Sequence, residues 1–135
     1  MRHYLLLGFL LMVSCRDAHL VVVGERHALS KDGLGLVCVL KLDADRSGWS
    51  IGTVIVTHQI IKYDVVNKFI LGYAEPYKSD VLELNSRGGW FIVDMDKDKV
   101  LENLSEEEFK KLLRSKLQMS PSKCNFKSTD WIPRG

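Results

Sequence analysis

The sequence predicts an α+β domain, a mainly antiparallel β-sheet with one amphipathic helix packed on it near the C-terminus. Short apolar and β-branched segments recur between residues 19 and 94, with turn-forming residues between them, which is typical of antiparallel strands. One capping motif and one stripe of apolar residues at helical spacing follow at 105–118. A run of strands followed by a single helix, without alternation of the two, favours an α+β fold.

The first strands are expected in the N-terminal half of the domain. Residues 19–23 are short and valine-rich, and 34–42 are apolar on both faces, so we expect the second segment at the centre of a sheet. Residues 24–33 carry charge, serine and glycine and are predicted to form a loop. Turn-forming residues at 43–48 lead into a long strand at 49–58.

The remaining strands are expected between residues 60 and 94. Residues 60–66 are predicted to be extended or to form an edge strand, and 68–74 form a further strand. Residues 81–84 and 89–94 flank Asn85-Ser86-Arg87-Gly88, which predicts a hairpin with a short loop.

The helix at 105–118 has the clearest local signals. Ser105 and Glu108 form a capping box, and the acidic first turn and basic later turns suit the helix dipole. We read its basic residues as a solvated face: Lys110, Lys111 and Arg114. Its apolar stripe comprises Phe109, Leu112, Leu113 and Leu117. Residues 120–135 follow as an irregular tail that we expect to be partly ordered.

Residues 1–14 have the pattern of an export signal. Arg2 precedes an apolar run at 4–13, which is shorter than the roughly 20 residues that a membrane-spanning helix needs. Met12-Val13-Ser14-Cys15 resembles the lipobox of bacterial lipoproteins. The resemblance implies cleavage before Cys15, a diacylglycerol on its thiol, and a tether over 15–18 before a domain at 19–119. Two alternatives are an ordinary signal peptide that leaves Cys15 as a plain thiol, and a buried segment of a cytosolic protein.

The other two cysteines have two interpretations. If Cys15 is lipidated, Cys38 and Cys124 remain as an even pair in an oxidising compartment, where they can form a disulfide. Such a bridge would close a long loop and stabilise the fold by roughly 4 to 5 kcal/mol. Alternatively, Cys38 is a small core residue of an apolar strand.

Charge and motifs exclude several function classes. The chain has 19 basic and 17 acidic residues, so we expect no nucleic-acid partner. The sequence contains no phosphate loop, dinucleotide fingerprint or nucleophile elbow, so we expect no cofactor. The histidines show no metal-ligand spacing and are interpreted as surface or strand residues: His19, His27 and His58.

Two aspartate-rich segments resemble the start of a calcium loop. Asp94, Asp96 and Asp98 alternate in one of them, and neither segment has the glutamate expected at position 12. We therefore predict solvated turns and no metal site. The alternative is calcium at the segment that has a glycine in the correct place: Asp43, Asp45 and Ser47.

The aromatic residues are the remaining candidates for a binding surface, because tryptophan and tyrosine are enriched at interface hot spots. The set comprises Trp49, Tyr63, Tyr73, Tyr77, Trp90 and Trp131. We expect Trp49 and Trp90 to pack in the core or on the sheet, and Trp131 to be exposed in the tail.

Residues 51–117 are similar to short bacterial lipoproteins of unknown function. The similarity rests on the strands at 69–73 and 90–94 and on the Leu-Ser-x-x-Glu-Phe helix start at 104–109. It implies no activity that can be transferred. Arg16 after the cysteine resembles the pattern that permits transfer to the outer membrane.

These observations predict a lipid-anchored envelope protein, facing the periplasm from the outer membrane, that binds a protein or envelope component and is not an enzyme. An inhibitor or immunity-type lipoprotein is one such protein. Two alternatives are a small envelope hydrolase or accessory enzyme with a dispersed site, and a structural envelope lipoprotein. The enzyme would need a cavity in which a histidine meets acidic or hydroxyl groups.

Overall fold

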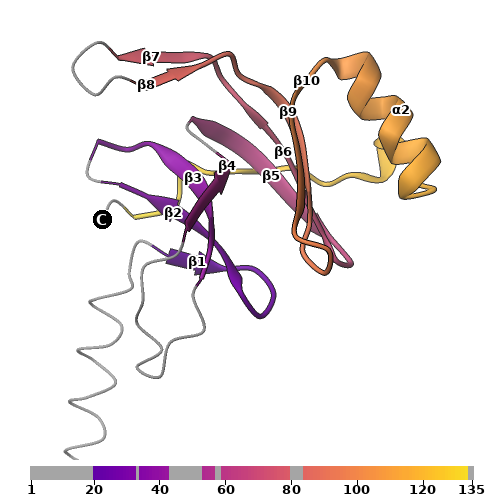
Figure 1. Cartoon of the computed structure of the whole chain (residues 1–135), viewed down its shortest axis with the longest axis horizontal. Helices are drawn as coiled ribbons and strands as arrows, with labels where there is room; N and C mark the ends of the chain where they lie inside the picture. The colour runs from indigo at the N-terminus through magenta and orange to yellow at the C-terminus, as the bar shows by residue number, and fades with distance from the viewer. Residues whose placement is uncertain (1–19, 33, 43–52, 57–58, 80–83, 134–135) are drawn as a thin grey trace, which may run out of the picture.

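The computed structural model describes residues 20–32, 34–42, 53–56, 59–79 and 84–133 (Figure 1). They form two main antiparallel sheets and a two-stranded ribbon, and a helix lies against the second main sheet on the side away from the first. The predicted α+β class is confirmed. Among these residues, no helix is both long enough and apolar enough to cross a membrane.

The first sheet has four strands in sequence order: β1 (Leu20–Val22), β2 (His27–Lys31), β3 (Val37–Lys41) and β4 (Thr53–Val56). The strands predicted around β1, β3 and β4 are confirmed, but the loop predicted over 24–33 is wrong because it contains β2. His27 and Lys31 are buried in this strand, with exposed fractions of 3% and 8%. The polar residues of β2 are buried, so its composition resembles that of a loop although it is a central strand.

The second sheet has the strand order β10-β9-β6-β5-β11. Its strands are β5 (Ile60–Val66), β6 (Phe69–Ala74), β9 (Gly89–Asp94), β10 (Lys99–Leu104) and β11 (Lys127–Ser128). The extended conformation predicted for 60–66 is confirmed. The strand is not at the edge, because β11 pairs with its outer side.

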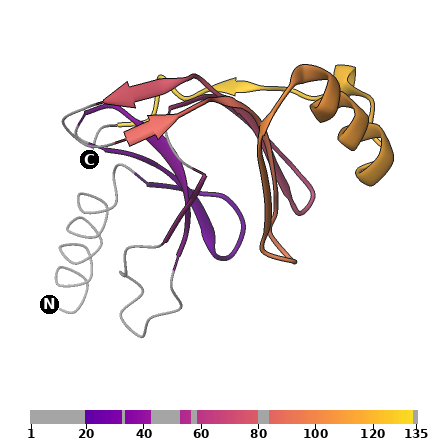
Figure 2. The same ribbon diagram turned by 45° about the horizontal axis from the view of Figure 1, so that its top comes forward.

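The hairpin predicted around 85–88 is wrong. β8 (Leu84–Ser86) pairs with β7 (Tyr77–Ser79), while β9 pairs with β6 and β10. The β7–β8 ribbon therefore extends the β6–β9 pair (Figure 2). Gly88 allows the change of direction, because it has a φ of +71° and a Cβ there would lie 2.5 Å from the Pro76 nitrogen.

Strand β10 was not expected from the sequence. Its ladder with β9 is irregular between Leu101 and Leu104, and Asn103 has a φ of 58°. An irregularity of this kind interrupts the alternation of apolar and polar residues by which strands are recognised.

Two separate cores lie on the two faces of the second sheet. Ile70 and Phe91 belong to the core shared with the first sheet, whereas Leu71 and Ile92 belong to the core beneath the helix. Because successive strand residues point to opposite faces, β6 and β9 contribute to both cores.

The helix α2 (Glu106–Lys116) confirms the predicted capping box. The Glu108 backbone N–H donates to Ser105 Oγ at 3.1 Å, and the Ser105 N–H donates to Glu108 Oε1 at 3.2 Å. Phe109 and Leu113 are the buried residues of its apolar stripe.

The tail is more ordered than its composition indicates. After the 3₁₀ turn η1 (Pro121–Lys123), the Asn125 N–H donates to Asp64 Oδ2 at 2.9 Å. Thr129 Oγ1 donates to the Ile60 carbonyl at 2.8 Å, and Ile132 is only 2% exposed. This part of the tail packs on β5 and in the first core, in agreement with the partial order expected over 120–135.

Candidate binding site

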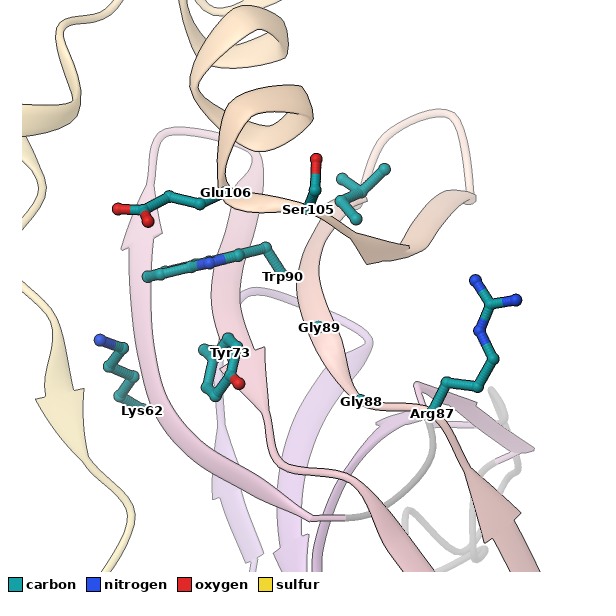
Figure 3. Close-up of a pocket in the computed structure, with 9 residues that line it drawn as sticks. Lys62, Tyr73, Arg87, Gly88, Gly89, Trp90, Ser105 and Glu106 are labelled. Carbon is teal, nitrogen blue, oxygen red and sulfur yellow. The ribbon is translucent and has the colours of Figure 1, made fainter.

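An open depression of about 600 Å³ lies on the helix side of the second sheet, where the sheet extends beyond the start of α2 (Figure 3). Strands β5, β6 and β9, the bend before β9 and the first residues of the helix contribute to it. We call it the Trp90 depression, and it is lined by Lys62, Tyr73, Arg87, Gly88, Gly89, Trp90, Leu104, Ser105 and Glu106.

Strand register aligns the central residues of the depression. Lys62 is directly opposite Tyr73 across the β5–β6 pair, and Tyr73 is directly opposite Trp90 across the β6–β9 pair. The three side chains therefore form one row across three neighbouring strands. We call this the Lys62–Tyr73–Trp90 row.

Aromatic contacts fix the Trp90 ring. It stacks on Phe109 of the helix at a centroid distance of 4.6 Å and an interplanar angle of 15°. Tyr73 and Phe126 make tilted contacts with Trp90 at 5.1 and 5.4 Å. Trp90 thus joins the helix, the sheet and the tail, and it remains half-buried at the depression.

Lys62 is the cation of this aromatic group. Its Nζ lies 4.7 Å from the Trp90 ring centroid, 5.8 Å from that of Tyr73 and 5.7 Å from that of Phe126. Such contacts attract a cation to the faces of aromatic rings. No carboxylate of the described residues lies within ion-pair distance of Lys62.

The other polar groups of the depression are largely engaged. Glu106 lies beside Trp90 in Figure 3, and its Oε1 accepts from Lys110 Nζ at 3.1 Å. Ser105 Oγ caps the helix by accepting from the Glu108 N–H. Arg87 is exposed and extends away from the aromatic side chains.

The predictions for the aromatic residues have mixed outcomes. Trp90 packs on the sheet and the helix as expected, and Trp131 is 57% exposed, so both predictions are confirmed. Tyr63 is buried in the first core, which removes it as a binding residue. Trp49 lies outside the described residues.

His27 lines a second cavity, of about 410 Å³, between the two main sheets, which we call the His27 cavity. Its Nε2 lies 3.8 Å from Asp98 Oδ1, and the same carboxylate accepts from Lys41 Nζ at 2.6 Å. Burial lowers the pKa of His27, Asp98 raises it, and Lys41 lowers it. Nε2 is buried and has no hydrogen-bond partner among the described residues.

This second cavity combines a histidine with carboxylates, which is one requirement of the enzyme alternative. Asp96 and Asp98 both line it. None of the described residues that line it supplies a hydroxyl or thiol nucleophile. His27 itself is a buried strand residue, as one of its two sequence interpretations expected.

The aspartates at 94–98 form a turn. Asp94 Oδ1 accepts from the backbone N–H groups of Asp96 and Lys97, each at 3.1 Å. The predicted solvated turn is therefore confirmed here. The structure's described portion contains no cluster of three or more residues of the types that bind metals.

Several predicted site residues lie outside the described part of the chain. They are Cys15, His19, Asp43, Asp45, Ser47 and His58.

The two remaining cysteines are free thiols, so the disulfide alternative for Cys38 and Cys124 is wrong. Cys38 is buried in strand β3 of the first sheet, whereas Cys124 packs against the core beneath the helix. The two thiols thus belong to different layers of the domain, and the interpretation of Cys38 as a core residue is confirmed.

The described residues define an α+β domain in which the helix α2 packs on the larger of the two main sheets beside an aromatic depression. The chain belongs to the family described as "Protein of unknown function (DUF3997)", whose model matches residues 32–129. No curated protein and no solved structure matches it.

Proposed function

We propose that the protein is a lipid-anchored protein of the cell envelope that binds a partner protein at the Trp90 depression. The leader at 1–14 and the lipobox-like segment ending at Cys15 support the anchor. In this proposal, Cys15 is the first residue of the mature protein, and the domain faces the periplasm from the outer membrane.

The observation that carries the binding role is the Lys62–Tyr73–Trp90 row. Its aromatic side chains are held rigidly by the sheet and by Phe109, yet they remain partly accessible beyond the start of the helix. Rigid aromatic residues provide large contact areas at low cost in conformational entropy, and they dominate many protein interfaces.

The charges of the depression indicate the chemistry of the partner. Lys62 has aromatic contacts but no carboxylate among the described residues, whereas Glu106 is already paired with Lys110. A partner that inserts an apolar side chain next to a carboxylate would fill the depression and supply the missing counter-charge for Lys62.

One specific form of the proposal is an inhibitor or immunity-type lipoprotein that neutralises an effector acting on the envelope. A small domain on a lipid tether suits this role, because inhibition requires a binding surface and no chemistry of its own. The groups that line the Trp90 depression support binding and not catalysis. Its serine, Ser105, uses its hydroxyl to cap the helix.

Site-specific photo-cross-linking in the full-length lipidated protein tests this proposal. A photoreactive residue replaces Glu106, beside the Trp90 ring, and a control probe replaces Lys111, which is exposed on the same helix. We expect one protein to be captured by the probe at 106 and not by the probe at 111.

If the proposal is correct, capture by the probe at 106 also depends on the positive charge of Lys62. Lys62→Glu reverses its charge and should abolish capture, whereas Lys111→Glu should leave the capture at 106 unchanged. Equal capture at both positions, or capture that Lys62→Glu does not reduce, would contradict the proposal. Circular dichroism verifies that each variant is folded. Membrane fractionation of Cys15→Ser tests the anchor separately, and a variant that stays membrane-bound would overturn it.

The His27 cavity favours a small hydrolase or accessory enzyme as the second candidate. A neutral histidine beside Asp98 has the groups that general-base activation of a water molecule requires. In complementation of a deletion phenotype, the enzyme alternative expects loss of function in His27→Gln and normal function in Lys62→Glu. The binding proposal expects the reverse.

A further inference from the structure

A third cavity, of about 360 Å³, lies between the C-terminal end of α2 and the second sheet. Its apolar lining comes from Phe69 of β6, Ile92 of β9, Leu101 of β10 and Leu117 after the helix. Four lysines surround this lining: Lys68, Lys97, Lys99 and Lys116. We call this cavity the lysine-rimmed pocket.

The charges of the lysine-rimmed pocket are unbalanced. Asp94 is its only acidic lining residue, and Asp94 Oδ2 lies 3.7 Å from Lys68 Nζ. Asp94 Oδ1 accepts two backbone hydrogen bonds from the turn. Among the described residues, the side chains of Lys97, Lys99 and Lys116 form no ion pair.

This pattern matches an amphiphilic anion. The apolar lining can receive the start of an aliphatic chain, while the lysine ammonium groups surround the entrance and repel one another when no anion is present. Lysine side chains suit such a boundary, because their stems lie on apolar surface while their charged ends remain in water. Lys68 already lies over the Phe69 ring at 5.4 Å.

The location of the pocket indicates a membrane as the source of the anion. Three turns line the His27 cavity together: the β1–β2 turn with Arg26, the β5–β6 turn with Lys68, and the β9–β10 turn. The β9–β10 turn also carries Lys97 of the lysine-rimmed pocket. These turns lie along the same lower edge of Figure 1 as β1. Strand β1 is the described element nearest in sequence to Cys15, and the membrane assignment rests on the proposed lipid anchor at that residue.

We propose that the lysine-rimmed pocket binds the headgroup and proximal acyl chain of an anionic phospholipid. The domain would then contact its membrane through this edge, in addition to any lipid on Cys15. A basic site and an acyl chain act together in stable membrane association, because one chain alone binds reversibly. The Trp90 depression is not part of this site.

Calorimetric titration of the full-length protein in a neutral detergent tests the proposal. The ligand is dihexanoyl-phosphatidylglycerol, and the reference is dihexanoyl-phosphatidylcholine, which has the same chains and no net charge. We expect the anionic lipid to bind at least roughly tenfold more tightly and its affinity to fall with added salt. Equal affinities for the two lipids would overturn the proposal.

Paired variants separate the pocket from general surface charge. Lys97→Ser with Lys99→Ser should weaken binding of the anionic lipid by roughly tenfold. Lys111→Ser with Arg114→Ser removes the same charge from the exposed helix face and should leave the affinity within about twofold. Equal losses in the two pairs would show non-specific attraction and overturn the proposal.

Inorganic phosphate is the control for the acyl chain. If phosphate binds as tightly as the lipid, the pocket is an ion site and the lipid assignment fails. Nuclear magnetic resonance locates the bound lipid, and we expect shifts at the amides of Phe69, Lys99 and Leu117. Shifts confined to the Trp90 depression would also overturn the proposal.

Discussion

The Phe91 ring occupies the space above Gly72 on the neighbouring strand. The two residues are direct partners in the β6–β9 ladder, and a Cβ on Gly72 would lie 2.5 Å from Phe91 Cζ. The same Cβ would lie 2.5 Å from the Lys62 carbonyl oxygen, which is backbone. The absence of a side chain at Gly72 therefore allows a large ring to close the core between the sheets.

Gly72→Ala should destabilise the protein, because the ring and the backbone of β5 must both shift. We expect a loss of about 1–3 kcal/mol in the free energy of unfolding, the usual range for overpacked cores. Chemical denaturation measures it. Adding Phe91→Leu should recover part of the loss, and Gly72→Ala with wild-type stability would refute this account.

Ile132→Ala should show that the C-terminal tail contributes to the fold. Ile132 is 2% exposed and belongs to the core between the sheets, so its truncation should cost about 2–5 kcal/mol. The neighbouring Trp131 is 57% exposed, and Trp131→Ala should change stability by about 0.5 kcal/mol or less. Similar effects of both substitutions would indicate that the tail does not pack in this way.

The protein should lose stability on acidification in two steps. Burial lowers the pKa of His27 below its ordinary value of 6.5, so the unfolded chain takes up the proton first. Stability is therefore fully present above about pH 6.5 and falls as the pH decreases through the lowered pKa of the folded state. The hydrogen bond from Lys41 lowers the pKa of Asp98 below 3.8, which adds a second loss in stronger acid.

Chemical denaturation across this pH range checks the prediction. His27→Gln should remove the step that begins near pH 6.5 and leave the step in stronger acid. A wild-type protein of constant stability from neutral pH to about pH 5 would contradict the assigned direction of the His27 pKa.

The thiols should differ in reactivity. Burial and the nearby Asp32 raise the pKa of Cys38 to about 11, so very little thiolate forms at neutral pH. In the native protein, we expect alkylation of Cys38 to be much slower than in denaturant, and slower than alkylation of the half-buried Cys124. Mass spectrometry under non-reducing conditions should find both cysteines as free thiols. A mass lower by two hydrogens than that of the reduced protein would show that they form a disulfide.

The elements that the sequence predicted correctly depend on local signals. The capping box of α2 joins residues three positions apart, and 69–74 and 89–94 are apolar enough to identify β6 and β9. Strand β2 was missed because His27 and Lys31 are buried through contacts with distant elements, such as Lys31 Nζ with the Asp130 carbonyl. Strand β10 was missed because its ladder is irregular.

The candidate binding site was only partly predictable. Tyr73 and Trp90 were recognised as aromatic candidates, but the alignment of Lys62 with them depends on the register of three strands. The hydrophobic pattern and the turns set this register, and only the paired strands show which residues it places opposite one another. The same limit applies to the lysine-rimmed pocket, whose lysines come from four separate elements or turns.

The two-sided burial of β6 and β9 fixes the position of the proposed binding row. A slip of one residue would move Ile70 and Leu71, or Phe91 and Ile92, into each other's cores, so both strands are held in register from two sides. Tyr73 and Trp90 extend from these same strands. If the row binds a partner as proposed, side-chain changes on the row would alter which partner is recognised, while the backbone that presents the row stays in place.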